Sequence, residues 1–228
     1  MDEHSITNVT TRTGEEEVTK FFPRFRWNII TINLFKMVLL DFKVLGVFDG
    51  VEREIEAKEE LTKIGVKTPS IISREGRTVK MSYLPGDNLR KVLLKSSESF
   101  CEDIGRKKGE QIKKFHLNGL ALVDSRLSNS ILGEDGKIAS VDHELFTKNP
   151  SNLDRQIDII SLKASAMFLP YEKSASFLQG FDKAYTVSKN LKFLRKILLL
   201  FSGPWLAVFG EKSFKSLRNF FKNWFKDF

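Results

Sequence analysis

The sequence lacks the features of several specialised protein classes. Its single cysteine, Cys101, excludes an internal disulfide framework and agrees with a reducing compartment. Its longest uncharged stretch near the C-terminus, residues 197–210, has 14 residues and contains a Gly-Pro pair, whereas a membrane-spanning helix needs about 20 apolar residues. The polar first residues have neither the basic start nor the apolar run of a signal peptide. We therefore expect neither an integral membrane protein nor a secreted one.

The composition is that of a globular domain, with positive charge concentrated near the C-terminus. The 228 residues are 41% hydrophobic and 29% charged, which is enough to form a core in one domain or in two small lobes. The formal net charge is +8. Residues 189–228 hold nine lysines and arginines against two acids, so this segment carries most of the excess. A basic tail indicates an anionic partner.

Hydrophobic periodicity predicts strands in the first part of the chain and helices in the second. Runs of β-branched and aromatic residues predict strands over residues 5–11, 15–22, 68–72, 77–84, 130–132 and 137–141. Apolar residues at helical spacing predict helices over residues 51–64, 89–94, 100–118 and 154–168, and in the remainder of the chain. Thr13-Gly14 is the expected turn of the first hairpin. This order predicts an α+β protein with two lobes.

The same pattern suggests domain boundaries. We predict a small N-terminal lobe over residues 1–84, a helical C-terminal lobe over residues 85–188, and a basic amphipathic extension over residues 189–228. The small lobe would contain a hydrophobic connector, residues 25–48, between its hairpin and its helix. The connector and the extension are both rich in aromatic and aliphatic residues. Either they pack on the large lobe as core helices, or they seat at a membrane interface with lysines on anionic lipid.

Three polar residues have the spacing and chemistry of a phosphoryl-transfer site. Asp124 is followed by Asn129 five residues later and, after an expected hairpin, by Asp142. Phosphoryl transfer needs a carboxylate to orient and deprotonate the attacking hydroxyl, and oxygen ligands to hold Mg²⁺ against a triphosphate. The spacing resembles that of protein-kinase motifs, and this resemblance implies Asp124 in the first role and Asn129 with Asp142 in the second. Because this spacing alone is common, its weight depends on the motifs around it.

The segment from Asp124 to Asp142 resembles the catalytic loop H-R-D-L-x-x-x-N of protein kinases and the D-F-G motif that follows it. Upstream, Arg53-Glu54 opens a predicted helix that is followed by G-V-K-T-P. This is similar to the R-E…L…G-V-x-x-P pattern of the atypical kinases that phosphorylate lipopolysaccharide core sugars, and of the related RIO and KEOPS-complex kinases. The resemblance covers residues 18–169. It implies a two-lobed protein-kinase-like fold with a reduced N-terminal sheet lobe and a helical C-terminal lobe.

The resemblance assigns nucleotide binding to four residues. Lys20 stands where the family has the strand lysine that holds the phosphates, and Glu54 stands where it has the glutamate that pairs with this lysine. Met81 and Tyr83 belong to a segment similar to the hinge, whose main-chain groups would meet adenine. The implied cofactors are ATP and Mg²⁺ or Mn²⁺. Glu56 is the alternative partner for Lys20, and solvated surface positions are the alternative for both Lys20 and Glu54.

Other residues of the large lobe also match the family. Arg126 stands where many kinases have a lysine that contacts the transferred phosphate, so it joins Asp124 as a candidate catalytic residue; a surface charge explains it equally well. Phe115-His116 is similar to the L-H pair in the helix before the catalytic loop. A hydrogen-bonded core histidine is our preferred reading of His116. Asp158 looks like the buried aspartate that braces the loop.

Three departures from the family pattern leave activity open. Leu122-Val123 replace the first two residues of the catalytic-loop motif, and Asp142-His143-Glu144 lacks the Phe and Gly of D-F-G. We expect too little chain before Ser5 for a first strand and a glycine-rich loop, whose main-chain donors normally cradle the phosphates. Both an active phosphotransferase and a catalytically silent pseudokinase fit this sequence.

The expected function is ATP- and Mg²⁺-dependent phosphoryl transfer to a hydroxyl of a lipid-linked or sugar substrate, or of a protein Ser/Thr. One alternative is a silent pseudokinase scaffold at a membrane surface. Another, ranked lower, is a nucleic-acid-binding module in which aromatic and basic residues of the tail stack on bases. The expected partners are a nucleotide, the hydroxyl-bearing acceptor and an anionic membrane surface that contacts residues 189–228. We expect a cytoplasmic protein, peripheral on the inner face of the membrane.

Overall fold

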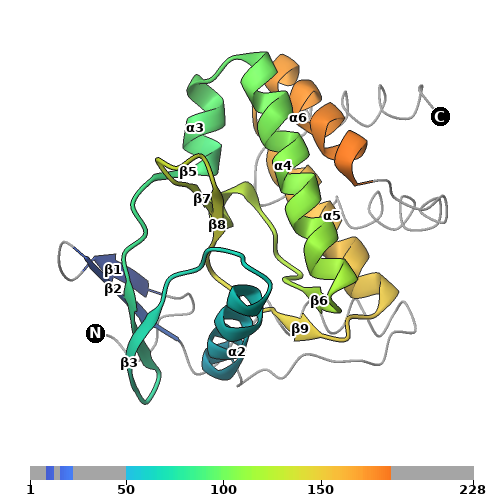
Figure 1. Ribbon diagram of the computed structural model, residues 1–228. Coiled ribbons are helices and arrows are strands. Elements are labelled where there is room, and N and C mark those ends of the chain that lie inside the picture. Colours follow the sequence, from blue (N-terminus) through green and yellow to red (C-terminus); the bar gives the residue numbers. More distant parts are fainter. Residues whose placement is uncertain (1–8, 13–15, 23–49, 186–228) are drawn as a thin grey trace, which may run out of the picture.

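An antiparallel sheet and a group of helices form the two halves of the protein in a computed structural model, which describes residues 9–12, 16–22 and 50–185 (Figure 1). The strands are β1 (Val9–Arg12), β2 (Glu17–Phe21), β3 (Ile71–Glu75), β4 (Thr78–Ser82), β5 (Asp87–Asn88), β6 (Leu120–Ala121), β7 (Ser130–Leu132), β8 (Ile138–Ser140) and β9 (Thr147–Lys148). The helices are α2 (Gly50–Lys63), α3 (Leu89–Lys95), α4 (Glu98–Leu117), α5 (Asn152–Ala166) and α6 (Tyr171–Ala184), with a short 3-10 turn, η1 (Leu127–Asn129).

The small lobe is a four-stranded antiparallel sheet in the order β1-β2-β4-β3. Strand β2 pairs with β4 so that Lys20 lies opposite Val79. A small core of Phe22, Val51, Val79 and Met81 joins this sheet to the start of α2. Side chains alternate between the two faces of a strand, and this core therefore fixes which residues of β2 and β4 face the helix.

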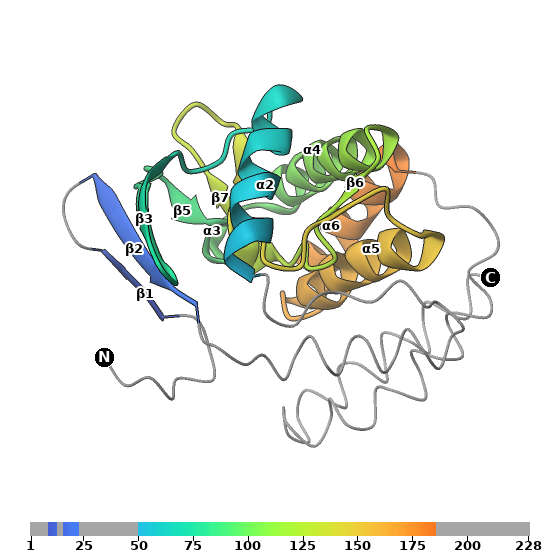
Figure 2. The ribbon, with the colours of Figure 1, turned by 90° about the horizontal axis from the view of Figure 1, so that it is seen from below.

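Helix α2 belongs to both halves of the protein. Figures 1 and 2 both place it between the sheet and the other helices. Its first turn contributes Val51 to the core of the sheet, whereas Ala57 and Leu61 lie in the large core formed with α3, α4, α5 and α6. Apolar residues four apart project from one side of a helix. The two cores are thus joined through one rigid element.

Two helices of the large lobe, α4 and α6, pack with their backbones very close together. A Cβ atom at Gly105 would collide with the carbonyl oxygen of Phe177, and one at Gly180 would collide with the carbonyl oxygen of Glu102. Glycine permits this approach because it has no side chain. The core beside this crossing includes the fully buried Phe181.

The hairpin of β7 and β8, extended by β5, lies next to this helical core. Asn129 directly precedes β7, and Asp142 follows β8. Its register pairs Ser130 with Ser140, and one step further the Val141 amide donates to the Asn129 carbonyl at 3.0 Å. The following helix, α5, begins with a capping box in which Ser151 and Asp154 satisfy each other's backbone amides.

The predicted α+β, two-lobed kinase-like architecture is confirmed, with the small antiparallel sheet preceding the helical part. The third strand begins at Ile71 and ends at Glu75, later than the predicted 68–72; Pro69, which has no N–H to donate, lies outside it. Strands β5, β6 and β9 were not predicted, because two-residue strands leave no periodic pattern.

Several sequence predictions concern residues outside those that the structure describes. They are the turn at Thr13-Gly14, the connector over residues 25–48 and the extension over residues 189–228. The three-part division of the chain therefore stays a prediction. Within the described residues, no helix is both long and apolar enough to cross a membrane.

Candidate functional site

Lys20, on β2, lies between two carboxylates that come from distant parts of the chain. Its Nζ atom is 3.0 Å from Glu54 Oε2 on α2 and 2.6 Å from Asp142 Oδ1, which follows β8. The Lys20 and Glu54 side chains are 5% and 1% exposed. Burial alone would lower the pKa of Lys20, but the charges of Glu54 and Asp142 outweigh it and raise the pKa. Lys20 is therefore a fully charged, doubly paired cation.

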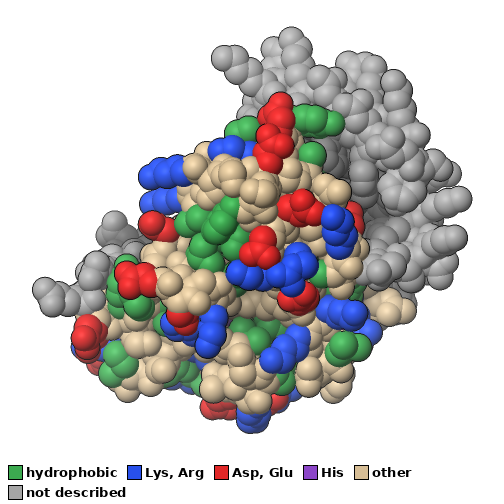
Figure 3. Space-filling view, turned by 45° about the horizontal axis from the view of Figure 1, so that its top comes forward, with side chains coloured by type: hydrophobic (Ala, Val, Ile, Leu, Met, Phe, Trp, Pro, Cys, Tyr) green, Lys and Arg blue, Asp and Glu red, His purple; other side chains and the backbone are tan. Residues whose placement is uncertain are grey.

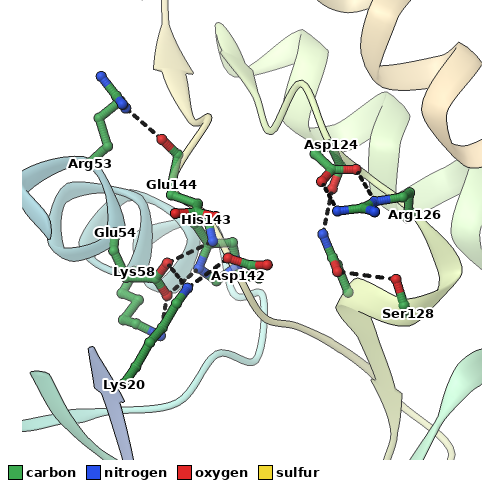
Figure 4. A network of polar contacts seen from close by, with 11 residues as sticks. Lys20, Arg53, Glu54, Lys58, Asp124, Arg126, Ser128, Asp142, His143 and Glu144 are labelled. Atoms are coloured by element: carbon green, nitrogen blue, oxygen red, sulfur yellow. Dashed lines mark hydrogen bonds and ion pairs between the residues drawn. The ribbon is translucent and has the colours of Figure 1, made fainter. Parts of the chain in front are cut away.

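Glu54 is held by more groups than the resemblance implied. Lys58, one turn along α2, places Nζ 3.1 Å from Glu54 Oε1, and the His143 amide donates to Oε2 at 2.8 Å. The His143 ring nitrogen Nδ1 is 3.4 Å from Oε1 (Figure 4). Burial would raise the pKa of Glu54, but the charges of Lys20 and Lys58 together with the His143 contacts hold it well below its usual range.

The alternative lysine–glutamate pair does not form. Glu56 lies on the surface, where its Oε1 is 2.9 Å from Lys148 Nζ. The spacing of two residues places Glu54 and Glu56 on different sides of α2. Glu54 is thus the glutamate that Lys20 contacts, as the resemblance implied.

Asp124 forms the second half of the candidate site together with Arg126. The Arg126 Nε and Nη2 atoms donate to the two carboxylate oxygens of Asp124 at 2.7 and 2.5 Å. The Asp124 carboxylate is 18% exposed and Arg126 is 49% exposed. Burial raises the pKa of Asp124, against the opposing effect of the guanidinium. Arg126 therefore contacts both oxygens of the predicted base.

The backbone is in the left-handed region next to Asp124 and at Asp142 itself. Val123, directly before Asp124, has φ of 64°, and Asp142 has φ of 63°. A β-branched residue such as valine rarely adopts this conformation. Strained residues of this kind are concentrated at functional sites, where the surrounding structure compensates for a cost of about 1–3 kcal/mol. At Asp142 the strain falls within the motif that lacks the usual glycine.

Asn129 connects the two acids. Its Nδ2 atom donates to the Asp124 carbonyl at 3.1 Å, and the Ser128 hydroxyl donates to its Oδ1 atom at 3.2 Å. Because the Asn129 carbonyl pairs with the Val141 amide, Asn129 and Asp142 lie at the same end of the β7–β8 hairpin. Figure 4 shows the group around Lys20 facing the pair of Asp124 and Arg126 across this end.

The donor set of Asn129 and Asp142 fits a hard cation. Carboxylate and amide oxygens suit Mg²⁺, which usually takes one or two protein ligands and completes its coordination with water and substrate phosphates. In the described part of the chain, no group of three or more His, Cys, Asp or Glu side chains could hold a metal alone. The metal assignment stays a prediction.

Side chains of α5 accept hydrogen bonds from the loop over residues 122–129. Asp158 accepts hydrogen bonds from the Leu122 amide at 3.3 Å and from the Ser125 hydroxyl. The Ser125 amide donates to Ser161 Oγ at 2.9 Å, and the Leu127 amide donates to Ser165 Oγ at 3.0 Å. Asp158 thus contacts this loop, as the resemblance suggested.

Met81 and Tyr83, the predicted hinge residues, lie at the end of β4. The Met81 side chain is buried in the small core, and its backbone lies between Val18 and Ile71 of the neighbouring strands. The Tyr83 amide donates to the Glu16 carbonyl at 2.6 Å. Adenine contact at these residues stays a prediction.

The sequence did not predict four residues that contact the candidate site or its loop: Lys58, His143, Ser161 and Ser165. Lys58 had a usable signal, because it lies four residues after Glu54 and therefore on the same side of the helix. Ser161 and Ser165 had one too, since they follow Asp158 at helical spacing. His143 had none: a histidine in place of phenylalanine does not reveal that its amide would bind Glu54.

Known proteins resemble part of this chain. No family model matches it. A protein of Methanococcus maripaludis (strain C7) named "Probable bifunctional tRNA threonylcarbamoyladenosine biosynthesis protein" is 31% identical over 115 residues, which are 50% of this chain and 20% of that protein. Proteins of the same name from M. maripaludis (strain C5) and Methanococcus vannielii are 29% and 27% identical over 135 and 138 residues. The latter two matches cover 58% of this chain and 24% of each relative.

The chain thus spans about a quarter or less of the length of these relatives. Together with the fold, the similarity agrees with the atypical kinase-like group at a coarse level. It provides no support for a lipopolysaccharide-type acceptor or for a membrane location.

Proposed function

We propose that this protein binds ATP with Mg²⁺ and transfers the terminal phosphoryl group to a hydroxyl. The observation that carries the proposal is the convergence of Lys20, Glu54 and Asp142, which are separated by up to 122 residues in the chain. A buried lysine between two carboxylates is suited to exchange one of them for a phosphate oxygen. Lys20 would keep Glu54 and release Asp142, which then becomes available to a metal.

The proposed metal ligands are Asn129 and Asp142. When bound, Mg²⁺ would neutralise charge on the phosphate oxygens, which is the main requirement of phosphoryl transfer. The protein's own contribution is to keep both ligands at one end of a short hairpin. Their spacing is set by the hydrogen bond between the Asn129 carbonyl and the Val141 amide.

Asp124 would orient the acceptor hydroxyl and take up its proton. Arg126 donates a hydrogen bond to each oxygen of this carboxylate. A guanidinium also binds phosphate in two-point fashion. Arg126 would therefore turn from Asp124 toward the phosphate when a nucleotide is present, which leaves Asp124 free to accept a proton. The raised pKa of Asp124 brings it closer to the range useful for a general base.

We consider two classes of acceptor for the phosphoryl group. The motifs favour a sugar, lipid-linked or protein hydroxyl, whereas the relatives carry a name that refers to tRNA modification. An alternative is therefore that the same site acts in tRNA modification, either by hydrolysing ATP or by phosphorylating a partner protein. Water would replace the acceptor hydroxyl in the hydrolytic case.

The test of the proposal is nucleotide-dependent stabilisation. A ligand that binds only the folded state raises the melting temperature by mass action. We expect Mg²⁺-ATP to raise the melting temperature of the wild type, and Asp142→Asn to lose most of this rise. Asp135→Asn, which changes an exposed acid in the β7–β8 turn, is the matched control. An equal rise in wild type and Asp142→Asn would refute the metal assignment, and no rise in the wild type would refute the proposal.

A catalytically silent scaffold is the second candidate. It is favoured by the two-point pairing of Asp124 with Arg126 and by the histidine and glutamate that replace the end of the D-F-G motif. Stabilisation by ATP without turnover, in the presence of candidate acceptors or water, supports this candidate.

The proposed partners beyond the nucleotide depend on residues 189–228. We propose that this basic segment binds an anionic membrane surface from the cytoplasmic side, with nucleic acid as the other anionic partner to be tested. On the face seen in Figure 3, basic and acidic side chains of the described residues are interspersed. Elsewhere among the described residues, ion pairs such as Arg106 with Asp103 and Glu110 likewise place charges of opposite sign side by side. The described residues on that face thus offer no broad positive field, and binding to anionic vesicles would depend on the basic segment.

A further inference from the structure

Glu54 contacts two buried lysines, although the kinase-like pattern provides it with only one. Lys20 Nζ lies 3.0 Å from its Oε2 atom, and Lys58 Nζ lies 3.1 Å from its Oε1 atom. All three side chains are 5% exposed or less. Figure 4 shows both lysine side chains pointing toward the Glu54 carboxylate, with Asp142 beside Lys20. Lys58 thus belongs to the candidate site, but the mechanism proposed above gives it no role.

Lys58 depends on Glu54 for its charge compensation. Among the described residues, Glu54 is the only ion-pair partner of Lys58, and the contact lacks the alignment of a hydrogen bond. Burial lowers the pKa of Lys58, and the charge of Glu54 opposes this effect. Because a buried ammonium group without a counter-charge is costly, Lys58 and Glu54 should stay together when other members of the site move.

The charges around Glu54 balance only while Asp142 takes part. Lys20 and Lys58 contribute two positive charges, and Glu54 and Asp142 contribute two negative ones. The buried His143 ring has a pKa lowered by burial, so it is neutral at pH 7 and does not enter this count. Asp142 is the most exposed member, at 33%, and it is the one that the proposed function assigns to the metal. Its departure would leave one positive charge in excess.

This excess charge favours a negatively charged ligand beside Lys20. One lysine paired with one glutamate forms a neutral group. Glu54 is already partly neutralised by Lys58, so it cancels less of the Lys20 charge than it would in a simple pair. Charges interact strongly where water is excluded. A triphosphate oxygen next to Lys20 can supply the missing negative charge, whereas an uncharged nucleoside cannot.

We propose that Lys58 is a positioning residue for nucleotide binding: it shares Glu54 with Lys20, and so leaves the positive charge of Lys20 available to a triphosphate when Asp142 turns to the metal. The nucleotide part of this proposal rests on the proposed function, whereas the charge balance around Glu54 does not. Lys58 would not touch the nucleotide itself, because its ammonium nitrogen is buried.

The first test compares ligands of different charge in Lys58→Met, which keeps a long unbranched side chain and removes the charge. Calorimetric titration in the presence of Mg²⁺ should give a dissociation constant raised about tenfold for ATP, raised less for ADP and unchanged for adenosine. A general disturbance of α2 would weaken all three ligands alike. Lys63→Met, at an exposed position of α2, is the control and should change none of them. Equal weakening of the three ligands in Lys58→Met, or an unchanged affinity for ATP, would overturn the proposal.

The second test needs no nucleotide. Asp142→Asn removes one negative charge from a balanced group, so it should lower the melting temperature of the wild type. In the Lys58→Met background the same change leaves one lysine with one glutamate. It should therefore lower the melting temperature less, or raise it, with a difference of roughly 3 °C or more between the two backgrounds.

This comparison also covers a Lys58→Met protein that is too unstable for titration, because addition of Asp142→Asn should then restore a melting transition. Equal shifts in the two backgrounds, or no restored transition, would show that Lys58 takes no part in the charge balance and would overturn the proposal. Absence of ATP binding by the wild type would refute the proposed function and with it the nucleotide role of Lys58. The melting temperatures would still decide whether Lys58 and Asp142 balance each other around Glu54.

Discussion

Among the residues that the structure describes, two buried lysines lie beside carboxylates and a third, Lys108, hydrogen-bonds to neutral groups. Lys20 and Lys58 share Glu54, and Asp142 adds a second negative charge to the same group. Removal of one member would leave Lys20, Lys58 or Glu54 as a buried charge with one compensating partner fewer, which is costly. Lys108, on α4, differs from them. Its Nζ atom donates to Ser130 Oγ at 2.9 Å and to Gln111 Oε1 at 2.7 Å, both neutral groups.

Because of Lys108, the free energy of unfolding should rise with pH in the alkaline range. Burial lowers its pKa from 10.5 to about 8. Between these values the unfolded chain binds the proton and the folded chain does not, so stability rises with pH in this window and the full penalty remains below it. Relative to Lys108→Met, the wild type should therefore gain roughly 2–3 kcal/mol between pH 7.5 and 10.

The measurement is the free energy of unfolding by denaturant at several pH values for both proteins. Lys113→Met, at an exposed position of the same helix, is the control and should run parallel to the wild type. Parallel curves for Lys108→Met and the wild type would mean that Lys108 keeps an ordinary pKa in the folded protein.

The sequence revealed the residues of the candidate site better than it revealed their contacts. The Lys20–Glu54 contact was expected because motif order brings a strand lysine and a helix glutamate together in a known group of folds. The pairing of Asp124 with Arg126 was not expected, because two residues at such spacing in a loop have no fixed geometry until the loop is folded. The same applies to Tyr185, whose hydroxyl lies 2.6 Å from Nδ1 of His116, 69 residues earlier in the chain.

At the scale of elements, hydrophobic periodicity predicted a helix or strand correctly where the element was long and had one apolar face. Helix α2 was predicted within one residue at each end because Gly65, with φ of 70°, marks the chain reversal that follows it. Helix α5 starts two residues earlier than predicted, at a capping box in which the side chains of Ser151 and Asp154 each accept a hydrogen bond from the other's backbone amide. The short strands β6 and β9 depend on pairing with each other across the chain, which no local pattern encodes.

The crossing of α4 and α6 should tolerate no side chain at its closest points. Gly180→Ala would place a methyl group against the Glu102 backbone, which cannot move away as a flexible side chain could. We expect a loss of roughly 1–3 kcal/mol in unfolding free energy, even though alanine is the better helix former. Gln179→Ala, at an exposed neighbouring position, should be neutral or slightly stabilising. A stable Gly180→Ala variant would show that the two helices can separate.

At the scale of the whole molecule, α2 unites the sheet and the helical core. The Arg53 Nε atom also donates to the Glu144 carbonyl at 2.6 Å, and the Glu54 carboxylate accepts from the His143 amide. Hydrophobic and polar contacts thus tie the same helix to both halves. Cooperative unfolding of the described residues follows from this arrangement.

Leu61→Ala should therefore destabilise both halves together. Leu61 is fully buried in the large core, and its truncation should cost about 2–4 kcal/mol. Amide exchange should accelerate by a similar factor in β4 and in α4, because both depend on α2. Thr62→Ala, at an exposed position, is the control. Acceleration confined to α4 would show that the sheet is independently stable.

The serines and the aspartate of α5 that hold the loop over residues 122–129 come later in the chain than the loop itself. During synthesis, the amides of that loop do not have all of these partners until residue 165 has emerged from the ribosome. The left-handed turn at Val123 would be unsupported until then. The nascent protein can thus acquire its sheet and α2 early, but the acid of the loop takes its final place only after α5 has been made.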